Sequence, residues 1–471
     1  MDTGVETIAA IATAPGFGGV GIVRISGPAA KVLLESVFRP GNPDFRGFRP
    51  WMLHYGRIVS TGEHVLDEAL AVYMPGPRSF TGEDVAELHC HGGPAILQAV
   101  LEELFGHGAR LAQPGEFTRR AFMNGRIDLA QAEAVAEAIA APGREALFAA
   151  QNKLHGGLSR AIADLRSRLL ELQASLTLAV DFPEEELELV PLEKLQADLE
   201  YVLEKIAALL AAHKRMQTFR EGALVVIAGQ VNVGKSSLLN AMLGRNRAIV
   251  TPHPGTTRDF LEEDLLLDGL PVRLVDTAGL RKTRNIVERQ GLELAMELFE
   301  QADQILLVVD IMRGPGQYEL DLFKRFGPDK ILGVVNKCDL AESRNDCWPK
   351  APAETAFCEL QKPVWLDVSA RFGQGIAELS AALKKRLLES SQQARFGESA
   401  WNIAPNLRQA QVLELARVEG EGILEELAQG VPYDLIGVRV ELMSAILAEV
   451  SGEIAPEDVL DRIFAEFCLG K

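Results

Sequence analysis

The sequence predicts a multidomain protein with an α+β N-terminal domain, an α-helical bundle domain and an α/β domain inserted into that bundle. Three observations favour this fold class. Strand-like and helical segments are mixed up to about residue 125, and long segments of helical periodicity follow them. Strands alternate with helices from about 219 to 388, which is typical of a parallel sheet covered by helices, before helical periodicity returns. The expected domains are 1–125, 126–218, 219–388 and 389–471, and the second and fourth are expected to pack together as one helical domain.

Each predicted element follows from a local pattern. In the first domain, apolar runs bounded by glycine predict strands in 18–27, 69–76 and 84–93, and 3.6-residue periodicity predicts a helix over 95–108. The bundle is predicted from segments 128–141, 158–180, 192–216 and 406–430. In the inserted domain, strands are expected in 223–230, 263–269, 271–279, 304–311 and 330–339, with a helix over 236–244.

The composition indicates a globular protein of several domains. A chain of 471 residues accommodates about three domains of ~100–200 residues each. The net charge of −18 makes the chain a poor general binder of nucleic acid, because phosphate neutralisation needs Lys and Arg. An RNA substrate therefore requires a local basic patch or a basic partner.

The cysteines and the N-terminus favour the cytoplasm. The five cysteines are odd in number and contain no CxxC pair, which is typical of a reducing compartment; they are Cys90, Cys338, Cys347, Cys358 and Cys468. The N-terminus is acidic where a secretory signal is basic, and no apolar run reaches the length of about 18 residues that a membrane span needs.

The segment "GQVNVGKSSLLN", which begins at Gly229, fits the phosphate-loop pattern G-x-x-x-x-G-K-[ST]. It follows a predicted strand and precedes a predicted helix, which is the context that the motif requires. Backbone N–H groups of such a loop approach phosphates, Lys235 is expected to reach the β- and γ-phosphates, and Ser236 to ligate Mg²⁺.

Three further motifs indicate a guanine nucleotide. Asp339 of "NKCD" (336–339) can accept hydrogen bonds from the two donors on the guanine edge, and adenine lacks both donors. Asp276 of "DTAG" (276–279) is expected to hold a Mg²⁺-bound water. Thr257 of "PGTTRD" (254–259) is expected to complete the Mg²⁺ ligand set, and "SAR" (369–371) lies downstream of "NKCD". The inserted domain is therefore predicted to be a Ras-like α/β P-loop GTPase domain.

The expected GTP-binding residues are Asn232, Val233, Gly234, Lys235, Ser236, Ser237, Thr251, Pro252, His253, Pro254, Gly255, Thr256, Thr257, Asp276, Thr277, Ala278, Gly279, Asn336, Lys337, Asp339, Ser369, Ala370 and Arg371.

Leu280 stands where Ras-like enzymes carry the glutamine that orients the attacking water. Hydrolysis then needs another water-orienting group and another source of positive charge. Glu288 is a candidate for the first role, and an ordinary exposed glutamate near a helix start is the alternative. Asn232 is a candidate for holding a monovalent cation against the phosphates, and an ordinary loop residue is the alternative.

The whole chain resembles the bacterial and organellar family of tRNA modification GTPases called MnmE or TrmE. The resemblance is carried by "ATAPGFGGVGIVRISG" (12–27), "SFTGEDVAELHCHGGP" (79–94), "QPGEFTRRAFMNGRIDLAQAEAVAEAI" (113–139), the inserted GTPase domain and the terminal "FCLGK" (467–471). It implies GTP hydrolysis with Mg²⁺ and activation by K⁺, which favours the head-to-head meeting of two GTPase domains in a homodimer. The implied K⁺ ligands are Asn232, Thr251, His253 and Thr256, and the implied catalytic residue is Glu288.

The resemblance further implies that the N-terminal domain binds a tetrahydrofolate derivative, 5-formyl- or 5,10-methylene-tetrahydrofolate, and forms a constant dimer interface. The implied folate-binding residues are Arg24, Glu87, Arg126 and Lys471. Position 126 is lysine in some relatives. Cys468 is the functionally sensitive cysteine of the family, and a nucleophile, a structural thiol and a packing residue all stay open for it. The run His89, Cys90, His91 is expected to be structural and not a metal site, because it lacks distant partner ligands.

The implied reaction is 5-(carboxymethyl)aminomethylation of the wobble uridine of certain tRNAs, together with the FAD- and NADH-dependent subunit MnmG (GidA) in a heterotetramer. GTP hydrolysis by dimerising GTPase domains is then expected to drive a conformational change. Two other functions stay open at this point. One is a ribosome-assembly or checkpoint GTPase without modification chemistry, and the other is a folate-dependent aminomethyltransferase that acts on a small molecule.

Overall fold

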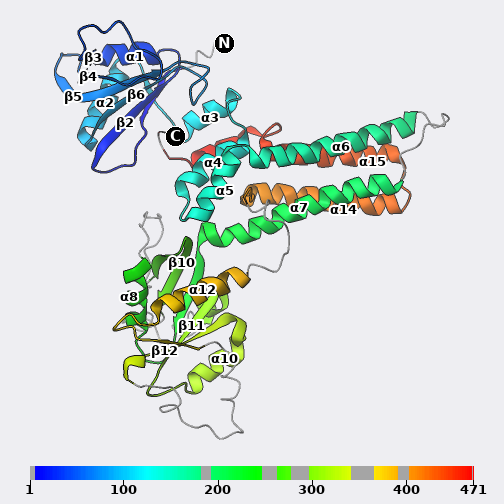
Figure 1. Ribbon diagram of the computed structural model, residues 1–471. Coiled ribbons are helices and arrows are strands. Elements are labelled where there is room, and N and C mark those ends of the chain that lie inside the picture. The colour runs from blue at the N-terminus through cyan, green and yellow to red at the C-terminus, as the bar shows by residue number, and fades with distance from the viewer. Residues whose placement is uncertain are drawn as a thin grey trace. The chain divides into compact units, whose positions relative to one another are not determined.

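The computed structural model describes residues 6–181, 192–246, 262–276, 296–340, 365–390, 402–468 and 470. The chain divides into two compact units (Figure 1). The first unit contains residues 1–139, 151–204 and 411–471, and the second contains residues 140–150 and 205–410. Among the described residues, no helix combines the length and the apolar character that a membrane crossing requires.

The first unit begins with a seven-stranded sheet in the order β3-β4-β5-β6-β2-β1-β7. Its strands are β1 (Ile8–Ile11), β2 (Gly18–Ser26), β3 (Phe38–Pro40), β4 (His54–Val59), β5 (Val65–Met74), β6 (Val85–Gly92) and β7 (Arg110–Leu111). Neighbouring strands are antiparallel except β1 and β7, which are parallel. Helices α1 (Ala30–Val37) and α2 (Pro94–Gly106) bury Leu34 and Leu104 against Val23 and Leu88 of the sheet.

The helical part of the first unit is built from segments that lie far apart in the sequence. Its helices are α3 (Glu116–Met123), α4 (Leu129–Ala140), α6 (Gly157–Asp181), α14 (Leu407–Ala428), α15 (Tyr433–Ser451) and α16 (Glu457–Ala465), with α5 (Arg144–Leu154) and α7 (Leu192–Glu221) continuing into the second unit. α6 packs along α15 (Figure 1). Gly420 of α14 lies so close to α7 and α15 that a Cβ there would stand 2.8 Å from Leu203 Cδ2 and 2.9 Å from Met443 Cε. The helices before and after the inserted domain therefore form one bundle, as expected.

The second unit contains a six-stranded sheet in the order β13-β12-β11-β8-β10-β9. Its strands are β8 (Ala223–Ala228), β9 (Glu262–Leu267), β10 (Leu270–Asp276), β11 (Gln304–Asp310), β12 (Ile331–Asn336) and β13 (Trp365–Val368). All pairs are parallel except β9 and β10. Its helices include α8 (Lys235–Asn246), α10 (Gln317–Lys330) and α12 (Ile376–Ser390), and the short 3-10 helix η2 (Cys338–Leu340) follows β12.

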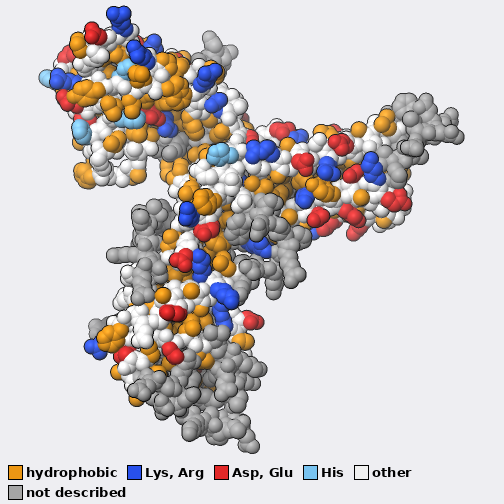
Figure 2. Space-filling view, in the orientation of Figure 1, with side chains coloured by type: hydrophobic (Ala, Val, Ile, Leu, Met, Phe, Trp, Pro, Cys, Tyr) orange, Lys and Arg blue, Asp and Glu red, His pale blue; other side chains and the backbone are white. Residues whose placement is uncertain are grey.

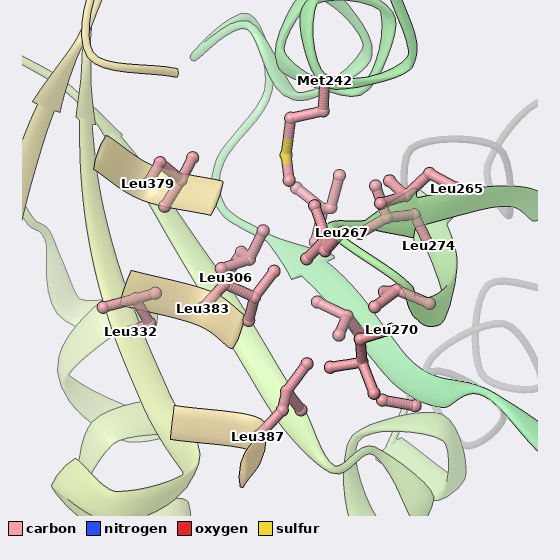
Figure 3. Packing of buried hydrophobic residues seen from close by; sticks show 14 of the residues in the cluster. Met242, Leu265, Leu267, Leu270, Leu274, Leu306, Leu332, Leu379, Leu383 and Leu387 are labelled. Atoms are coloured by element: carbon pink, nitrogen blue, oxygen red, sulfur yellow. The ribbon is translucent and has the colours of Figure 1, made fainter. Parts of the chain in front are cut away.

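Both faces of this sheet are buried. Val225 and Ile227 of β8 belong to the cluster that also contains Met242 of α8 and Leu383 of α12, while Val226 belongs to the cluster on the other face, against α10. Figure 3 shows how leucines of α12, β9, β10, β11 and β12 meet Met242 in the first of these clusters. Such two-sided burial explains why β8, β11 and β12 are nearly continuous apolar runs.

The predicted fold class is confirmed by these two sheets and the shared bundle. The expected strands and helices lie within a few residues of their predicted positions. The short strands β1, β3, β4, β7 and β13 are not among the expected ones. The exact domain boundaries of 125, 218 and 388 stay a prediction.

Candidate functional site: a phosphate loop, a base-reading edge and an N-terminal arginine–glutamate pair

The phosphate loop joins β8 to α8 and is packed tightly against its neighbours. Gly229 has φ 143°, and a Cβ there would lie 2.3 Å from the carbonyl oxygen of Val308. Gly234 has φ 96°, and a Cβ there would lie 2.3 Å from Nδ2 of Asn336. Both glycines are therefore required by close approach as well as by backbone conformation, since a Cβ is strained at positive φ.

Lys235 and Ser236 open α8, as the motif predicts. The buried Lys235 folds back over the loop, where Nζ donates to the carbonyl oxygens of Gly229 and Gln230 at 2.8 Å each. Ser236 Oγ donates to Oδ2 of Asp276 at 2.7 Å. Asp276 ends β10 and is fully buried. The structure thus brings together a hydroxyl and a carboxylate, which are hard oxygen ligands of the kind that Mg²⁺ prefers.

The residues expected to read guanine follow β12 and β13. Asn336 Nδ2 donates to the carbonyl oxygen of Val233 at 2.9 Å, and its Oδ1 accepts from the N–H of Ala370 at 3.0 Å. Asn336 therefore ties the phosphate loop to the segment 369–371. The buried Ser369 donates through Oγ to Oδ1 of Asp339 at 2.6 Å, which orients that carboxylate and leaves Oδ2 with no contact to Ser369.

Lys337 and the remaining predicted residues complete this edge. Lys337 has φ 67°, and its Nζ donates to the carbonyl oxygen of Asn232 at 3.0 Å and to Oδ2 of Asp310 at 2.7 Å. Asn232 also has a left-handed backbone, with φ 68°. Ser237 is exposed on the first turn of α8, and the guanidinium of Arg371 lies 5.4 Å from the ring centroid of Phe372.

Several predicted site residues lie outside the described part of the chain. They are Thr251, Pro252, His253, Pro254, Gly255, Thr256, Thr257, Thr277, Ala278, Gly279, Leu280, Glu288 and Lys471. Their roles as GTP, Mg²⁺, K⁺, catalytic and folate residues stay predictions.

Arg24 and Glu87 form a pair in the N-terminal sheet, where the register of β2 and β6 places them opposite each other. Arg24 Nε donates to Oε1 of Glu87 at 2.8 Å, and Oε2 of Glu87 is hydrogen-bonded to Nε2 of His89 at 3.1 Å. The Arg24 guanidinium also lies 5.9 Å from the ring centroid of Phe80 and 5.8 Å from that of Phe117. Burial raises the pKa of the Glu87 carboxyl, but the hydrogen bonds and charges of His89 and Arg24 outweigh burial and hold it below its ordinary value.

Arg126 reaches the same segment as Arg24. Its Nε donates to the carbonyl oxygen of Ser79 at 3.2 Å, next to Phe80, which lies beside Arg24. Asn124 anchors the segment 79–81, because its Nδ2 donates to the carbonyl oxygen of Thr81 at 2.7 Å. The structure therefore gathers Arg24, Glu87 and Arg126 around the segment 79–81.

The C-terminal segment returns to this sheet. Gly470 lies against the end of β1, because a Cβ there would stand 2.2 Å from the carbonyl oxygen of Ile11. The neighbouring residue of β1, Ala10, pairs with Arg24 of β2. Cys468, which precedes this segment, is exposed.

The three residues of the run 89–91 have separate contacts. His91 Nδ1 is hydrogen-bonded to Oδ1 of Asp67 at 2.7 Å, and this bond raises the pKa of His91. Cys90 is buried, and burial, followed by the charge of Asp67, raises the pKa of its thiol to about 12. Cys90 is therefore a protonated packing residue at neutral pH.

Four partners at these sites are not among the predicted site residues: Asp310, Phe80, Phe117 and His89. Asp310 has no motif around it that points to Lys337, and Phe80 and Phe117 resemble ordinary apolar residues. His89 stands in the sequence within the run 89–91, and its contact with Glu87 appears only in the structure. The available signal for His89 was strand alternation, which places it on the same face as Glu87.

Family models match most of the chain. A model described as "GTP-binding protein TrmE N-terminus" matches residues 7–126, and a model described as "MnmE helical domain" matches residues 129–468.

Relatives that match along nearly their whole length are named "tRNA modification GTPase MnmE". A protein of Nitratidesulfovibrio vulgaris strain DP4 is 50% identical over 467 residues, which cover 99% of each chain. A protein of Lawsonia intracellularis is 46% identical over 468 residues, covering 99% of this chain and 100% of the relative. A protein of Desulfotalea psychrophila is 41% identical over 471 residues, covering 99% of this chain and 98% of the relative.

Proposed function

The chain belongs to the MnmE family of tRNA modification GTPases, and from this premise we propose that it couples GTP hydrolysis to modification of the wobble uridine of certain tRNAs. As a member of this family the chain binds GTP and is a GTP hydrolase. The modification is 5-(carboxymethyl)aminomethylation, and its one-carbon unit comes from a tetrahydrofolate derivative. One observation carries the proposal: a phosphate loop tied to a guanine-reading edge and a separate arginine–glutamate pair occur in one chain.

In the GTPase domain, Ser236 and Thr257 ligate Mg²⁺, and the Ser236–Asp276 contact supports this role. Asn232, Thr251, His253 and Thr256 hold K⁺, which supplies the positive charge that an arginine finger supplies elsewhere. Glu288 orients the attacking water through a second water, in place of the missing glutamine at Leu280. Asn232 lies inside the phosphate loop, and its left-handed backbone supports the proposed role as a K⁺ ligand.

The N-terminal site takes 5-formyl- or 5,10-methylene-tetrahydrofolate through Arg24, Glu87, Arg126 and Lys471. A pterin presents amide-like donors that suit the Glu87 carboxylate, and guanidinium groups suit its carbonyl and the glutamate tail. The position of Gly470 against β1 supports the inclusion of Lys471, the next residue. The Glu87 oxygens are occupied by Arg24 and His89, so a pterin donor must share them.

The functional assembly is a homodimer that joins the FAD-dependent subunit MnmG in a heterotetramer, with tRNA as the substrate of the complex. K⁺ binding favours the meeting of two GTPase domains, and the opening that follows hydrolysis reorganises the complex. The net charge of −18 supports the proposal that the partner subunit provides most of the basic surface that contacts tRNA.

The test compares three kinds of cells: cells that lack this chain, and the same cells carrying either the wild-type gene or the Arg24→Ala variant. Mass analysis of tRNA nucleosides is expected to find the modified wobble uridine only with the wild type. Calorimetry with 5-formyl-tetrahydrofolate is expected to detect binding to the purified wild-type chain. Unchanged modification without the chain, or no folate binding, favours a checkpoint GTPase without modification chemistry.

A further inference from the structure

Glu319 is a buried carboxylate beside the phosphate loop. It lies in the first turn of α10 and is only 1% exposed. Figure 2 shows acidic side chains interspersed with basic ones over the visible surface, which is the ordinary place for a carboxylate. Because burial of a carboxylate is costly unless it accepts hydrogen bonds, the groups that Glu319 contacts indicate its role.

One oxygen of Glu319 accepts two hydrogen bonds. Its Oε2 accepts from the backbone N–H of Gly316 at 2.9 Å and from Nε2 of Gln230 at 2.9 Å. The first bond caps the start of α10, as the third helical residue does in a capping box. The second bond reaches 89 positions back in the sequence, to the second residue of the phosphate-loop motif. The same oxygen therefore fixes the helix start and holds the phosphate loop.

Gln230 in turn contacts Lys235. The carbonyl oxygens of Gly229 and Gln230 each accept a hydrogen bond of 2.8 Å from Lys235 Nζ. Gly229 is fixed by its close packing against Val308. Gln230 is exposed, so its order depends on contacts such as the one with Glu319. The described contacts thus run from the buried carboxylate through the side chain and carbonyl of Gln230 to the Lys235 ammonium.

The glycine before α10 leaves room for this contact. A Cβ on Gly316 would stand 2.6 Å from Nε2 of Gln230, a distance that no ordinary carbon contact reaches. The backbone of Gly316, with φ −110°, would itself accept a side chain. The missing side chain at this position is therefore explained by the space that the Gln230 amide occupies, and not by backbone conformation.

We propose that Glu319 is a positioning residue for nucleotide binding. It holds Gln230, and it thereby fixes one of the two carbonyl oxygens that orient the Lys235 ammonium. An ammonium that is already oriented binds phosphate without the cost of ordering its side chain. Glu319 and Gln230 are both outside the set of predicted GTP-binding residues. This inference rests on the predicted role of Lys235 as a phosphate ligand.

The test measures the affinity of the full-length chain for a fluorescent GDP, together with the melting temperature. Glu319→Ala removes the contact, whereas Glu319→Gln keeps an amide oxygen that can accept both hydrogen bonds. Gly316→Ala displaces the Gln230 amide and leaves Glu319 unchanged. Asp321→Asn is the matched control, because Asp321 lies in the same helix, is exposed, and accepts from Nε2 of Gln317 at 2.8 Å.

We expect Glu319→Ala, Gln230→Ala and Gly316→Ala each to lower GDP affinity by about threefold to tenfold, because each removes the same hydrogen bond. Glu319→Gln and Asp321→Asn should stay within about twofold of wild type. The double variant of Glu319→Ala with Gln230→Ala should bind GDP no more weakly than the weaker single variant, since the two changes break one contact. The lost helix cap should lower the melting temperature of Glu319→Ala equally with and without Gln230.

Three results overturn the inference while leaving the nucleotide site intact. They are wild-type GDP affinity in the variants that remove the contact, additive losses in the double variant, and a loss in Glu319→Gln as large as in Glu319→Ala. Additive losses indicate that Glu319 acts only through α10, and a loss in Glu319→Gln indicates that its charge matters and not the contact. Where Glu319→Ala does not fold, Gly316→Ala and Gln230→Ala decide the test. A wild-type chain that does not bind GDP overturns the predicted phosphate loop and this inference together.

Discussion

Ser236, the second residue of α8, donates a hydrogen bond of 2.7 Å to Asp276, the last residue of β10. The two residues are 40 positions apart, and the parallel pairing of β8 with β10 brings them together. Asp276 lies beside Ile227, two residues before the phosphate loop. This contact joins the predicted phosphate loop to the "DTAG" motif, and it supports the proposed Mg²⁺ site.

Glu288→Ala should abolish GTP turnover while sparing GTP binding. The proposed role is to orient the attacking water, so its loss should lower kcat by about 10²-fold or more without a matching change in nucleotide affinity. Single-turnover hydrolysis and fluorescent-nucleotide binding check this. Turnover at the wild-type rate removes Glu288 from the catalytic role, and Glu297→Ala, which lies nearby in sequence, serves as the control.

Asn232→Ala should erase stimulation by K⁺. The side-chain oxygen of Asn232 is the proposed cation ligand, while its backbone carbonyl contact with Lys337 is kept in the variant. Hydrolysis is compared in KCl and NaCl at equal ionic strength. Stimulation that persists in the variant counts against the cation site, and Asn240→Ala on the exposed side of α8 is the matched control.

Asp339→Asn should shift nucleotide preference from guanine toward xanthine. An amide presents a donor where the guanine edge also presents donors, whereas xanthine presents an oxygen there, so the preference ratio should change by about 10²-fold or more. Competition of GDP and XDP for the site measures the ratio. The Ser369 hydroxyl can still donate a hydrogen bond to the side-chain oxygen of Asn at position 339, so the variant side chain keeps this contact. An unchanged preference for GDP refutes the base-reading role of Asp339.

Arg24→Ala should weaken binding of 5-formyl-tetrahydrofolate by about tenfold to a hundredfold, because a charge-assisted hydrogen bond is lost. Arg57→Ala is the control, since Arg57 lies in the same sheet with an exposed partner, Glu68, at 3.4 Å. Calorimetry measures both. Equal affinities in the two variants would place the folate elsewhere.

Acid should destabilise the chain partly through Glu87. The pKa of Glu87 in the folded chain lies below its ordinary value, so its stabilising contribution is complete above the unfolded pKa of about 4.3 and is lost as the pH falls through the folded value. The melting temperature should therefore fall less steeply below about pH 5 in Glu87→Gln than in wild type. Parallel curves for the two proteins contradict this, and Glu63→Gln, an exposed partner of Arg39, should follow wild type.

Local patterns in the sequence determined the long elements and the nucleotide motifs. The apolar runs of β8, β11 and β12 are readable because each is buried on both faces, and the phosphate loop is readable because its glycines obey a fixed spacing. The strands β1 and β7 are not among the predicted ones because they have only four and two residues, and the parallel pairing between them joins segments that are distant in the sequence, so neither leaves a local pattern.

The tertiary structure alone decided which distant groups meet. The register of β2 and β6 set Arg24 against Glu87, and the pairing of β11 with β12 set Asp310 against Lys337. Neither contact follows from spacing along the chain, because a shift of one residue in either register would turn these side chains to opposite faces or move them apart. The sequence therefore predicts the residue types at each site, whereas strand pairing determines which residues contact one another.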